Sequence, residues 1–281
     1  MKVAILTDSA ANLTKEYIDL HKNLFVVPLV ISIDGKEYRD GVEISATEIY
    51  EKLENHQVKT SLPFGSDVWE ILDEIKKQGY TDLVVINISS GLSGTYNSIR
   101  LALASLEGMN VIHYDTLTLA GGEGLLVEYA VELIEKGTPV SELKPLLDQA
   151  RFEDSIAFYT INTLKYLRRG GRIGKVEGTL GDILHIKPVI TVNNEGEYIT
   201  LSKGFGLNRA LITMKTILTE KFGQDLIDLV IHYGLDYEGA LSLGEKLKGV
   251  LNVRQLTVVQ LTPVLGVHTG PDMVAYIARR V

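Results

Sequence analysis

The sequence of 281 residues contains no cysteine, which excludes structural disulfides and catalysis by a thiolate. Its six histidines include no pair at metal-ligand spacing, and the HExxH pattern is missing, so we expect no metal site. A Walker A loop and a GxGxxG motif are also missing, which argues against nucleotide binding by a standard loop. We therefore expect a protein without metal or cofactor.

Long apolar runs are scarce as well. The N-terminus, MKVAILTDSA, has too short an apolar run for a signal peptide, and the run over 24–31 contains Pro28 and is far too short to cross a bilayer. Positive charge is in deficit, because 28 Lys and Arg residues stand against 36 Asp and Glu residues, giving a net charge of −8. This balance argues against nucleic acid as the main partner. Together these features predict a cytoplasmic protein.

Strand and helix patterns alternate along the chain, which indicates an α/β fold. The length suits two domains. We expect an N-terminal α/β domain over 1–153, with a mostly parallel sheet and helices on both faces, and a C-terminal α/β domain over 154–281 with a more antiparallel sheet. Several local elements are predicted too: one strand over 25–33 with an edge or irregularity at Pro28, a helix that begins with a capping box of Ser45 and Glu48, an extended loop over 59–63, a helix capped by Ser66 and a turn over 265–271.

The stretch LVVINISSGLSGTYNSIR, residues 83–100, carries the clearest chemical signal. An apolar run suited to a buried strand is followed by a turn of serines, glycines and Thr95, and then by apolar residues at helical spacing. Such a turn presents free backbone N–H groups and hydroxyls at a helix N-terminus, which is where anions bind. Ser93 can equally be a simple helix cap. The residues alone leave these two interpretations evenly balanced.

Other polar residues fall where ligands bind in open α/β folds. Asp8 and Ser9 follow the first strand, at the carboxyl edge of a sheet, although turn and capping roles are the commoner explanation. Thr60 precedes Pro63 in an extended stretch, and His268 stands between glycines in GVHTGP. If Thr60, Ser93 and His268 face one cleft, two hydroxyls and an imidazole can hold a carboxylate. The turn contains no lysine or arginine, which favours a carboxylate over a doubly charged phosphate.

A glycine-rich segment, LAGGEGLL, opens the helix predicted over 118–135. Each glycine in a helix interior costs about 1 kcal/mol relative to alanine. One explanation is close helix packing. The other is a smooth wall against which a long apolar ligand lies, with Leu119, Gly121, Gly122 and Leu125 as its lining.

A serine esterase or thioesterase using Ser93 and His268 is an alternative from another functional class. The segment GLSGT lies between a strand and a helix, as a nucleophile elbow does. That motif requires G-x-S-x-G, however, and position 95 is threonine. No aspartate can be singled out as the third member of a triad. A binding module for another amphiphilic ligand is a further alternative.

Six motifs in order resemble the DegV family, whose members include the fatty-acid-binding B subunits of bacterial fatty acid kinase. They are TDSAANL, KTSLP, SSGLSGTYNS, LRRGGRI, IKPVI and VHTGP, and they span the whole chain. The resemblance implies a fatty acid buried between or beneath two α/β domains and, at most, transient membrane contact. It also implies that a separate kinase phosphorylates the bound acid, giving an acyl phosphate for phospholipid synthesis, while this chain performs no chemistry.

The resemblance also implies site residues. The carboxylate is expected near Thr60, Ser93 and His268, with help from the Gly94 N–H. Ser61, Thr95 and Ser9 are expected to support it. Arg168, Arg169 and Arg172 are candidates for docking the kinase, although cations at a helix C-terminus are an equally good explanation.

The chain departs from the family pattern at two positions. Leu62 stands in KTSLP where relatives often have glutamine, and Phe205 stands where many have an arginine suited to placing phosphate or the kinase. Kinase coupling is therefore less firmly implied than lipid binding.

Overall fold

The computed structural model describes residues 2–180 and 186–281 of an α/β fold. A four-stranded sheet in the order β2-β1-β6-β7 has every neighbouring pair parallel. Its strands are β1 Val3–Asp8, β2 Leu24–Val27, β6 Asp82–Asn87 and β7 Asn110–Asp115. Strands β1 and β6 are almost continuously apolar and buried, as expected when helices cover both faces of a parallel sheet.

Helices cover both faces of this sheet, as predicted. One face packs against α3 Gly65–Lys77 and α4 Thr95–Leu103, through side chains such as Leu72 and Ile99. The other packs against α5 Gly121–Glu135 and α6 Val140–Phe152, with α1 Lys15–Leu20 at its margin. Pro145 lies inside α6 without ending it.

A six-stranded mixed sheet follows, in the order β10-β9-β8-β13-β11-β12. Its strands are β8 Ser155–Thr160, β9 Ile186–Val192, β10 Tyr198–Phe205, β11 Leu226–Tyr233, β12 Asn252–Gln260 and β13 Val274–Arg280. Strands β11 and β12 run parallel, and the other neighbouring pairs run antiparallel. Helices α9 Leu207–Phe222 and α10 Tyr237–Lys248 pack on one face. The predicted fold class, with a more antiparallel second sheet, is confirmed.

A small antiparallel sheet, β4-β3-β5, corrects two local predictions. It contains β3 Val30–Ile33, β4 Lys36–Arg39 and β5 Val58–Ser61. The single strand predicted over 25–33 is broken at Pro28, because β2 and β3 belong to different sheets. The predicted loop over 59–63 begins as strand β5, which pairs with β3 and gives Thr60 a fixed position opposite Ile31.

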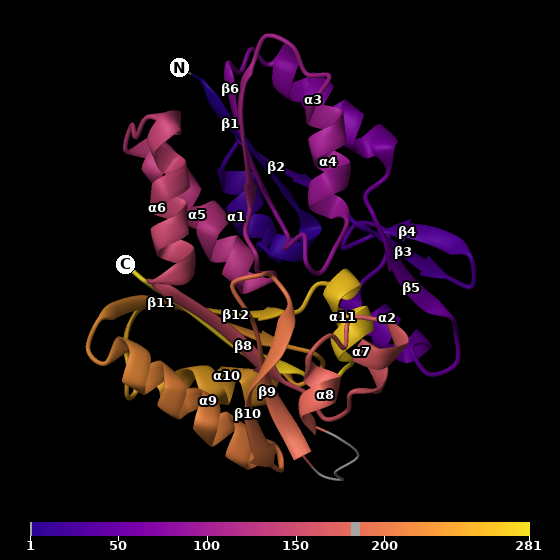
Figure 1. The fold of residues 1–281 in the computed structure, drawn as a ribbon, viewed down its shortest axis with the longest axis vertical. Coiled ribbons are helices and arrows are strands. Elements are labelled where there is room, and N and C mark those ends of the chain that lie inside the picture. The colour runs from indigo at the N-terminus through magenta and orange to yellow at the C-terminus, as the bar shows by residue number, and fades with distance from the viewer. Residues whose placement is uncertain (1, 181–185) are drawn as a thin grey trace.

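The remaining helices are short. They are α2 Ala46–Lys52, α7 Lys165–Arg169, α8 Val176–Leu180 and α11 Pro263–Thr269, with a 3₁₀ turn at Ser9–Ala11. The turn predicted over 265–271 is mostly helix α11, which lies against α2 and α7 (Figure 1). Ser66 is not a cap, because α3 begins one residue before it. The capping box of Ser45 and Glu48 on α2 is confirmed.

The largest apolar cluster lies where the three sheets meet. It joins Ile31 of the small sheet, Leu125 of α5, Leu265 of α11 and Ile277 of β13. The first half of the chain ends with α6 at Phe152, and the six-stranded sheet begins at Ser155, which is where the predicted division at 153 falls. That division remains a prediction. Within residues 2–180 and 186–281, no helix is long and apolar enough to cross a membrane.

Candidate ligand-binding site

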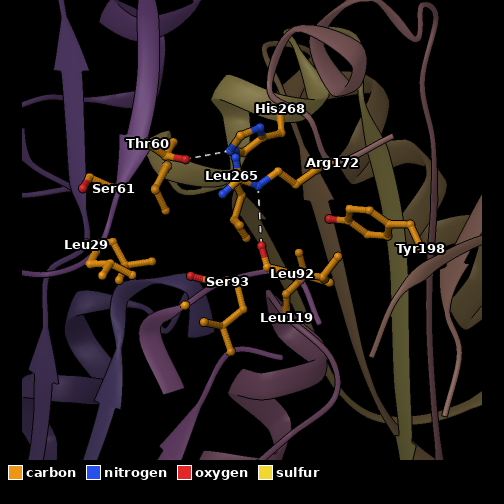
Figure 2. A pocket seen from close by; sticks show the side chains of 14 residues that line it. Leu29, Thr60, Ser61, Leu92, Ser93, Leu119, Arg172, Tyr198, Leu265 and His268 are labelled. Carbon is orange, nitrogen blue, oxygen red and sulfur yellow. Dashed lines mark hydrogen bonds between the residues drawn. The ribbon is translucent and has the colours of Figure 1, made fainter. Parts of the chain in front are cut away.

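A cavity of about 230 Å³ lies among β5, the β6–α4 turn, α11 and the segment after α7 (Figure 2). We call it the polar cavity. It is lined by Leu29, Thr60, Ser61, Leu62, Ile88, Leu92, Ser93, Gly94, Leu119, Arg172, Tyr198, Val264, Leu265 and His268. Thr60, Ser93, Gly94 and His268, which the sequence predicted to act together, therefore line one cavity although they span 208 residues of chain.

The β6–α4 turn prepares Ser93 to donate a hydrogen bond into this cavity. Ser93 Oγ accepts from the Thr95 N–H at 3.2 Å and lies 2.8 Å from Thr95 Oγ1. Thr95 is fully buried, and the Thr95 hydroxyl forms its hydrogen bond with Ser93. Because buried hydroxyls satisfy their hydrogen bonds, we assign Thr95 as the donor to Ser93. The Ser93 proton is then free for a ligand, so Ser93 accepts from the first N–H group of α4 and can also donate into the cavity.

Gly94 is the capping residue immediately before α4, which begins at Thr95, and it is exposed. The first N–H groups of a helix have no partner within it, so they point toward the space in front of the helix. The methyl group of an alanine at this position would lie 3.2 Å from Leu62 Cδ2. Glycine thus keeps the approach to the turn open.

The imidazole of His268 lies against Thr60, with Nε2 at 2.9 Å from Thr60 Oγ1 (Figure 2). Burial, followed by the nearby positive charge of Arg172, lowers the pKa of His268 to about 3. The ring is therefore neutral at pH 7 and does not add a positive charge to the site. Its Nδ1 is buried and bonds to no described residue. Because an unpaired buried donor is costlier than an unpaired lone pair, we assign the proton to Nε2, where Thr60 accepts it. The Thr60 hydroxyl proton is then free for a ligand.

Gly170 and Gly171, which precede Arg172, leave room for the His268 imidazole. The Cβ atom of any other residue at position 170 would lie 2.1 Å from His268 Nδ1. Gly171 has a φ of +69°, a conformation that suits glycine. The chain can therefore pass close to His268 and turn Arg172 back toward the cavity.

Arg172 lines the polar cavity and is the site residue whose role the sequence prediction missed. Its Nη1 donates to the Gly170 carbonyl at 2.6 Å, and its Nε lies 3.5 Å from the Leu92 carbonyl. The β6–α4 turn contains no lysine or arginine, as the sequence shows, but Arg172 brings a positive charge to the cavity from another segment. Arg168 and Arg169 are exposed and do not line the cavity; they bond to Glu177 and to the Leu53 carbonyl.

The three predicted supporting residues lie in different places. Ser61 lines the polar cavity at its exposed side. Thr95 lies buried beneath Ser93. Ser9 lies elsewhere, since it accepts from the Leu29 N–H at 3.0 Å and lines a separate cavity with Asp8, so the structure contradicts its predicted place in the site.

A second cavity of about 40 Å³, the apolar cavity, adjoins the first. It is lined by Leu119, Ala120, Ala157, Phe158, Tyr159, Thr191, Val192, Tyr198, Leu261, Leu265, Thr269, Met273, Ala275 and Ile277. Leu119, Tyr198 and Leu265 also line the polar cavity, so these three side chains form the partition between the two. The combined space therefore has one polar end and one apolar end.

The glycines of α5 have a packing role. A Cβ atom at Gly121 would lie 2.9 Å from His232 Nε2, which also accepts the Gly121 N–H at 2.8 Å. One at Gly122 would lie 2.6 Å from Thr118 Oγ1. Of the four residues predicted to line an apolar ligand, Leu119 lies at the cavities, Leu125 is buried in the core, and the two glycines allow close packing.

The geometry does not provide the pair of groups that a serine esterase needs. A nucleophilic serine must lie within hydrogen-bond reach of its base. Here Ser93 bonds to Thr95, and His268 Nε2 bonds to Thr60. Among residues 2–180 and 186–281, no cluster of acidic or histidine side chains could hold a metal ion. His185 lies outside the described residues.

Comparison with known proteins gives consistent matches over the whole chain. Residues 2–280 match a family model described as "Uncharacterised protein, DegV family". A DegV domain-containing protein of Clostridium acetobutylicum is 35% identical over 276 residues, covering 98% of both chains. A DegV family protein of Thermus thermophilus, whose structure is described as fatty acid binding, has a TM-score of 0.92 and 29% identity over 100% of both chains. A stearic acid-binding protein of Eubacterium ventriosum has a TM-score of 0.88 and 30% identity over 100% of this chain and 98% of its own.

Proposed function

We propose that this chain, which belongs to the DegV family, binds a long-chain fatty acid and presents its carboxylate to a partner kinase for conversion to an acyl phosphate. The observation that carries the proposal is the juxtaposition of the two cavities. A space with hydrogen-bond donors at one end and apolar side chains at the other matches an amphiphile with one polar head. The solved relatives described as binding fatty acids support the same ligand class.

In this proposal the carboxylate lies in the polar cavity. Ser93 and Thr60 each have a hydroxyl proton to donate, the N-terminus of α4 adds backbone N–H groups, and Arg172 supplies the opposite charge. These donors matter because a carboxylate buried without partners would raise its pKa and become protonated. The donor set therefore keeps the acid ionised, which is the form that a kinase must phosphorylate.

The acyl chain then extends past Leu119, Tyr198 and Leu265 into the apolar cavity. A chain of roughly fourteen methylenes contributes on the order of 11 kcal/mol from burial, before the costs of binding are subtracted. The apolar cavity is narrow, so the chain must move the three partition side chains as it enters. Binding energy from the tail is large enough to drive such a rearrangement.

Presentation to a kinase is the finer part of the proposal. Ser93 and His268 do not pair as nucleophile and base, and the rim of the polar cavity at Ser61 and Leu62 is exposed, so a second protein can reach the carboxylate. Arg168 and Arg169 are exposed on α7, which packs against α11, and they are candidates for docking charges. Phe205 is 66% exposed on β10, where it offers an apolar contact instead of the arginine common in the family.

Native mass spectrometry of freshly purified protein tests lipid binding directly. We expect a bound mass that matches a long-chain acid and that stearic acid displaces. Ser93→Ala should lower stearate affinity about 3- to 10-fold, the value of one hydrogen bond. Ser90→Ala is the matched control, because Ser90 is exposed in the same turn. A protein that neither retains nor takes up long-chain acid would refute the proposal; a protein that binds acid but never supports acyl phosphate formation with a fatty acid kinase would refute the finer part.

A further inference from the structure

The TDSAANL motif does not supply the polar cavity, yet one of its side chains crosses to the other half of the chain. Asn12 has a left-handed backbone, with φ of 54°, which projects its amide toward the β12–α11 connection. Its Nδ2 donates to the Gln260 carbonyl at 3.1 Å, and its Oδ1 accepts from the Thr262 N–H at 2.6 Å. Asn12 therefore fixes the chain on both sides of Leu261, immediately before α11 begins.

Asp40 holds the beginning of the same helix. It is 2% exposed; its Oδ1 accepts from the Val264 N–H at 2.8 Å, and its Oδ2 accepts from Thr262 Oγ1 at 2.7 Å. Thr262 occupies the capping position of α11 but makes no side-chain cap of its own, because its hydroxyl donates to Asp40. Asp40 thus caps α11 from 224 residues away in the sequence.

Helix α11 supplies Val264, Leu265 and His268 to the polar cavity. It has only seven residues, so its first turn and His268 move together. His268 in turn orients Thr60 through their 2.9 Å hydrogen bond. A displacement at the start of α11 therefore reaches two of the groups that face the ligand.

We propose that Asn12 and Asp40 are positioning residues, which hold α11 so that His268 and Thr60 meet the ligand's carboxylate. This inference rests on the proposed function. A carboxylate is an expensive way to secure a helix if stability alone is at stake, since burial raises the pKa of Asp40 to about 6. The two carboxylate oxygens of Asp40 accept hydrogen bonds from the β12–α11 connection at the same time and in one plane, which fixes the orientation of that connection.

The test separates positioning from stability by measuring discrimination between two ligands. Dissociation constants for stearic acid and stearyl alcohol are measured for each variant well below its unfolding temperature. Asp40→Ala should reduce the preference for the acid over the alcohol about tenfold, the value of one misplaced charge-assisted hydrogen bond. Asp40→Asn should restore most of the preference, because its amide oxygen still accepts from Val264 and its amide can donate to Thr262. Asn12→Ala and Thr262→Val test the same contacts independently and should each reduce the preference severalfold.

Asp82→Ala is the matched control. Asp82 is a buried acid of similar exposure, 3%, and bonds to Thr81 and Asn110 at the opposite end of the parallel sheet. It should lower stability without changing the preference for the acid. If wild type binds stearic acid selectively and the Asp40, Asn12 and Thr262 variants keep that selectivity, the positioning role is wrong while the proposed function stands. If wild type binds neither ligand, the proposed function itself fails.

Discussion

The two cavities share Leu119, Tyr198 and Leu265, yet they are built in opposite ways. The polar cavity draws on β5, the β6–α4 turn, α11 and the segment after α7, and it contains hydroxyls, an imidazole and a guanidinium. The apolar cavity lies mainly on strands β8, β9, β10 and β13 of the six-stranded sheet and is lined almost only by hydrocarbon. A sheet face supplies a regular apolar surface, whereas convergent polar groups come from loops and helix ends. The difference predicts that the apolar cavity sets affinity and the polar cavity sets orientation.

Chain length should have the largest effect, because it probes the apolar cavity alone. Stearic acid has about eight methylenes more than decanoic acid, which corresponds to roughly 6 kcal/mol, or on the order of 10⁴-fold in affinity. The measurement is a competition series across saturated acids. The corresponding alcohols should show the same slope per methylene. A flat series would mean that the tail stays outside the apolar cavity.

Arg172 should have the next largest effect, and only on charged ligands. Replacing Arg172 with glutamine removes the positive charge from the polar cavity, and a hydrogen bond to a charged group contributes about 1.5–3 kcal/mol. We expect stearate affinity to fall about 10- to 100-fold, with stearyl alcohol unchanged. Arg168→Gln is the matched control, because Arg168 bonds to Glu177 outside the cavity. An equal loss of affinity for the acid and the alcohol would show that Arg172 maintains the fold and does not bind the ligand's carboxylate.

His268 should give the polar cavity a pH dependence that the apolar cavity lacks. Its pKa is about 3 in the folded protein and about 6.5 when unfolded, so acid protonates the unfolded state first and stability is lost as pH falls below 6.5. By pH 5, His268 alone should lower the free energy of unfolding by about 2 kcal/mol. His268→Gln should remove that share of the acid destabilisation. The lowered pKa values of His113 and His232, both about 4, are present in both proteins and cancel in the difference.

The measurement is the free energy of unfolding in urea at pH 7 and pH 5 for both proteins. Identical pH dependence in wild type and His268→Gln would mean that His268 titrates normally. That result would remove the basis for a neutral imidazole bonded to Thr60. It would not affect the expectations for the apolar cavity.

The sequence predicted what depends on local pattern. The parallel strands, the α2 capping box and the turn of hydroxyls and glycines are specified by neighbouring residues, and the structure confirms those elements. Pro28 was correctly identified as an irregularity, but no local pattern shows that β2 and β3 join different sheets. The same limit applies to α11, a helix whose cap is Asp40, far away in sequence.

The site was predicted in part for the same reason. Thr60, Ser93 and His268 were grouped by their motifs, and the structure places them around one cavity. Arg172 was assigned to a surface because it follows two arginines at a helix end. Only the left-handed Gly171 and the contact with the Leu92 carbonyl, 80 residues away, turn it inward. Ser9 was misplaced because the edge of a sheet faces more than one cavity.

A substitution at Leu62 should have the smallest effect on affinity, and it tests which end of the ligand lies at the rim of the polar cavity. It is 41% exposed at the rim of the polar cavity, so Leu62→Gln should change stability by no more than about 0.5 kcal/mol. The new amide can donate to a bound carboxylate, so stearate affinity should rise about two- to threefold while stearyl alcohol is unaffected. The same change at Leu119, in the partition, should weaken both ligands strongly, because it buries an amide against the acyl chain. A loss of affinity for both ligands in Leu62→Gln would show that the tail, not the head, lies against this rim, and the assignment of the two cavities would have to be reversed.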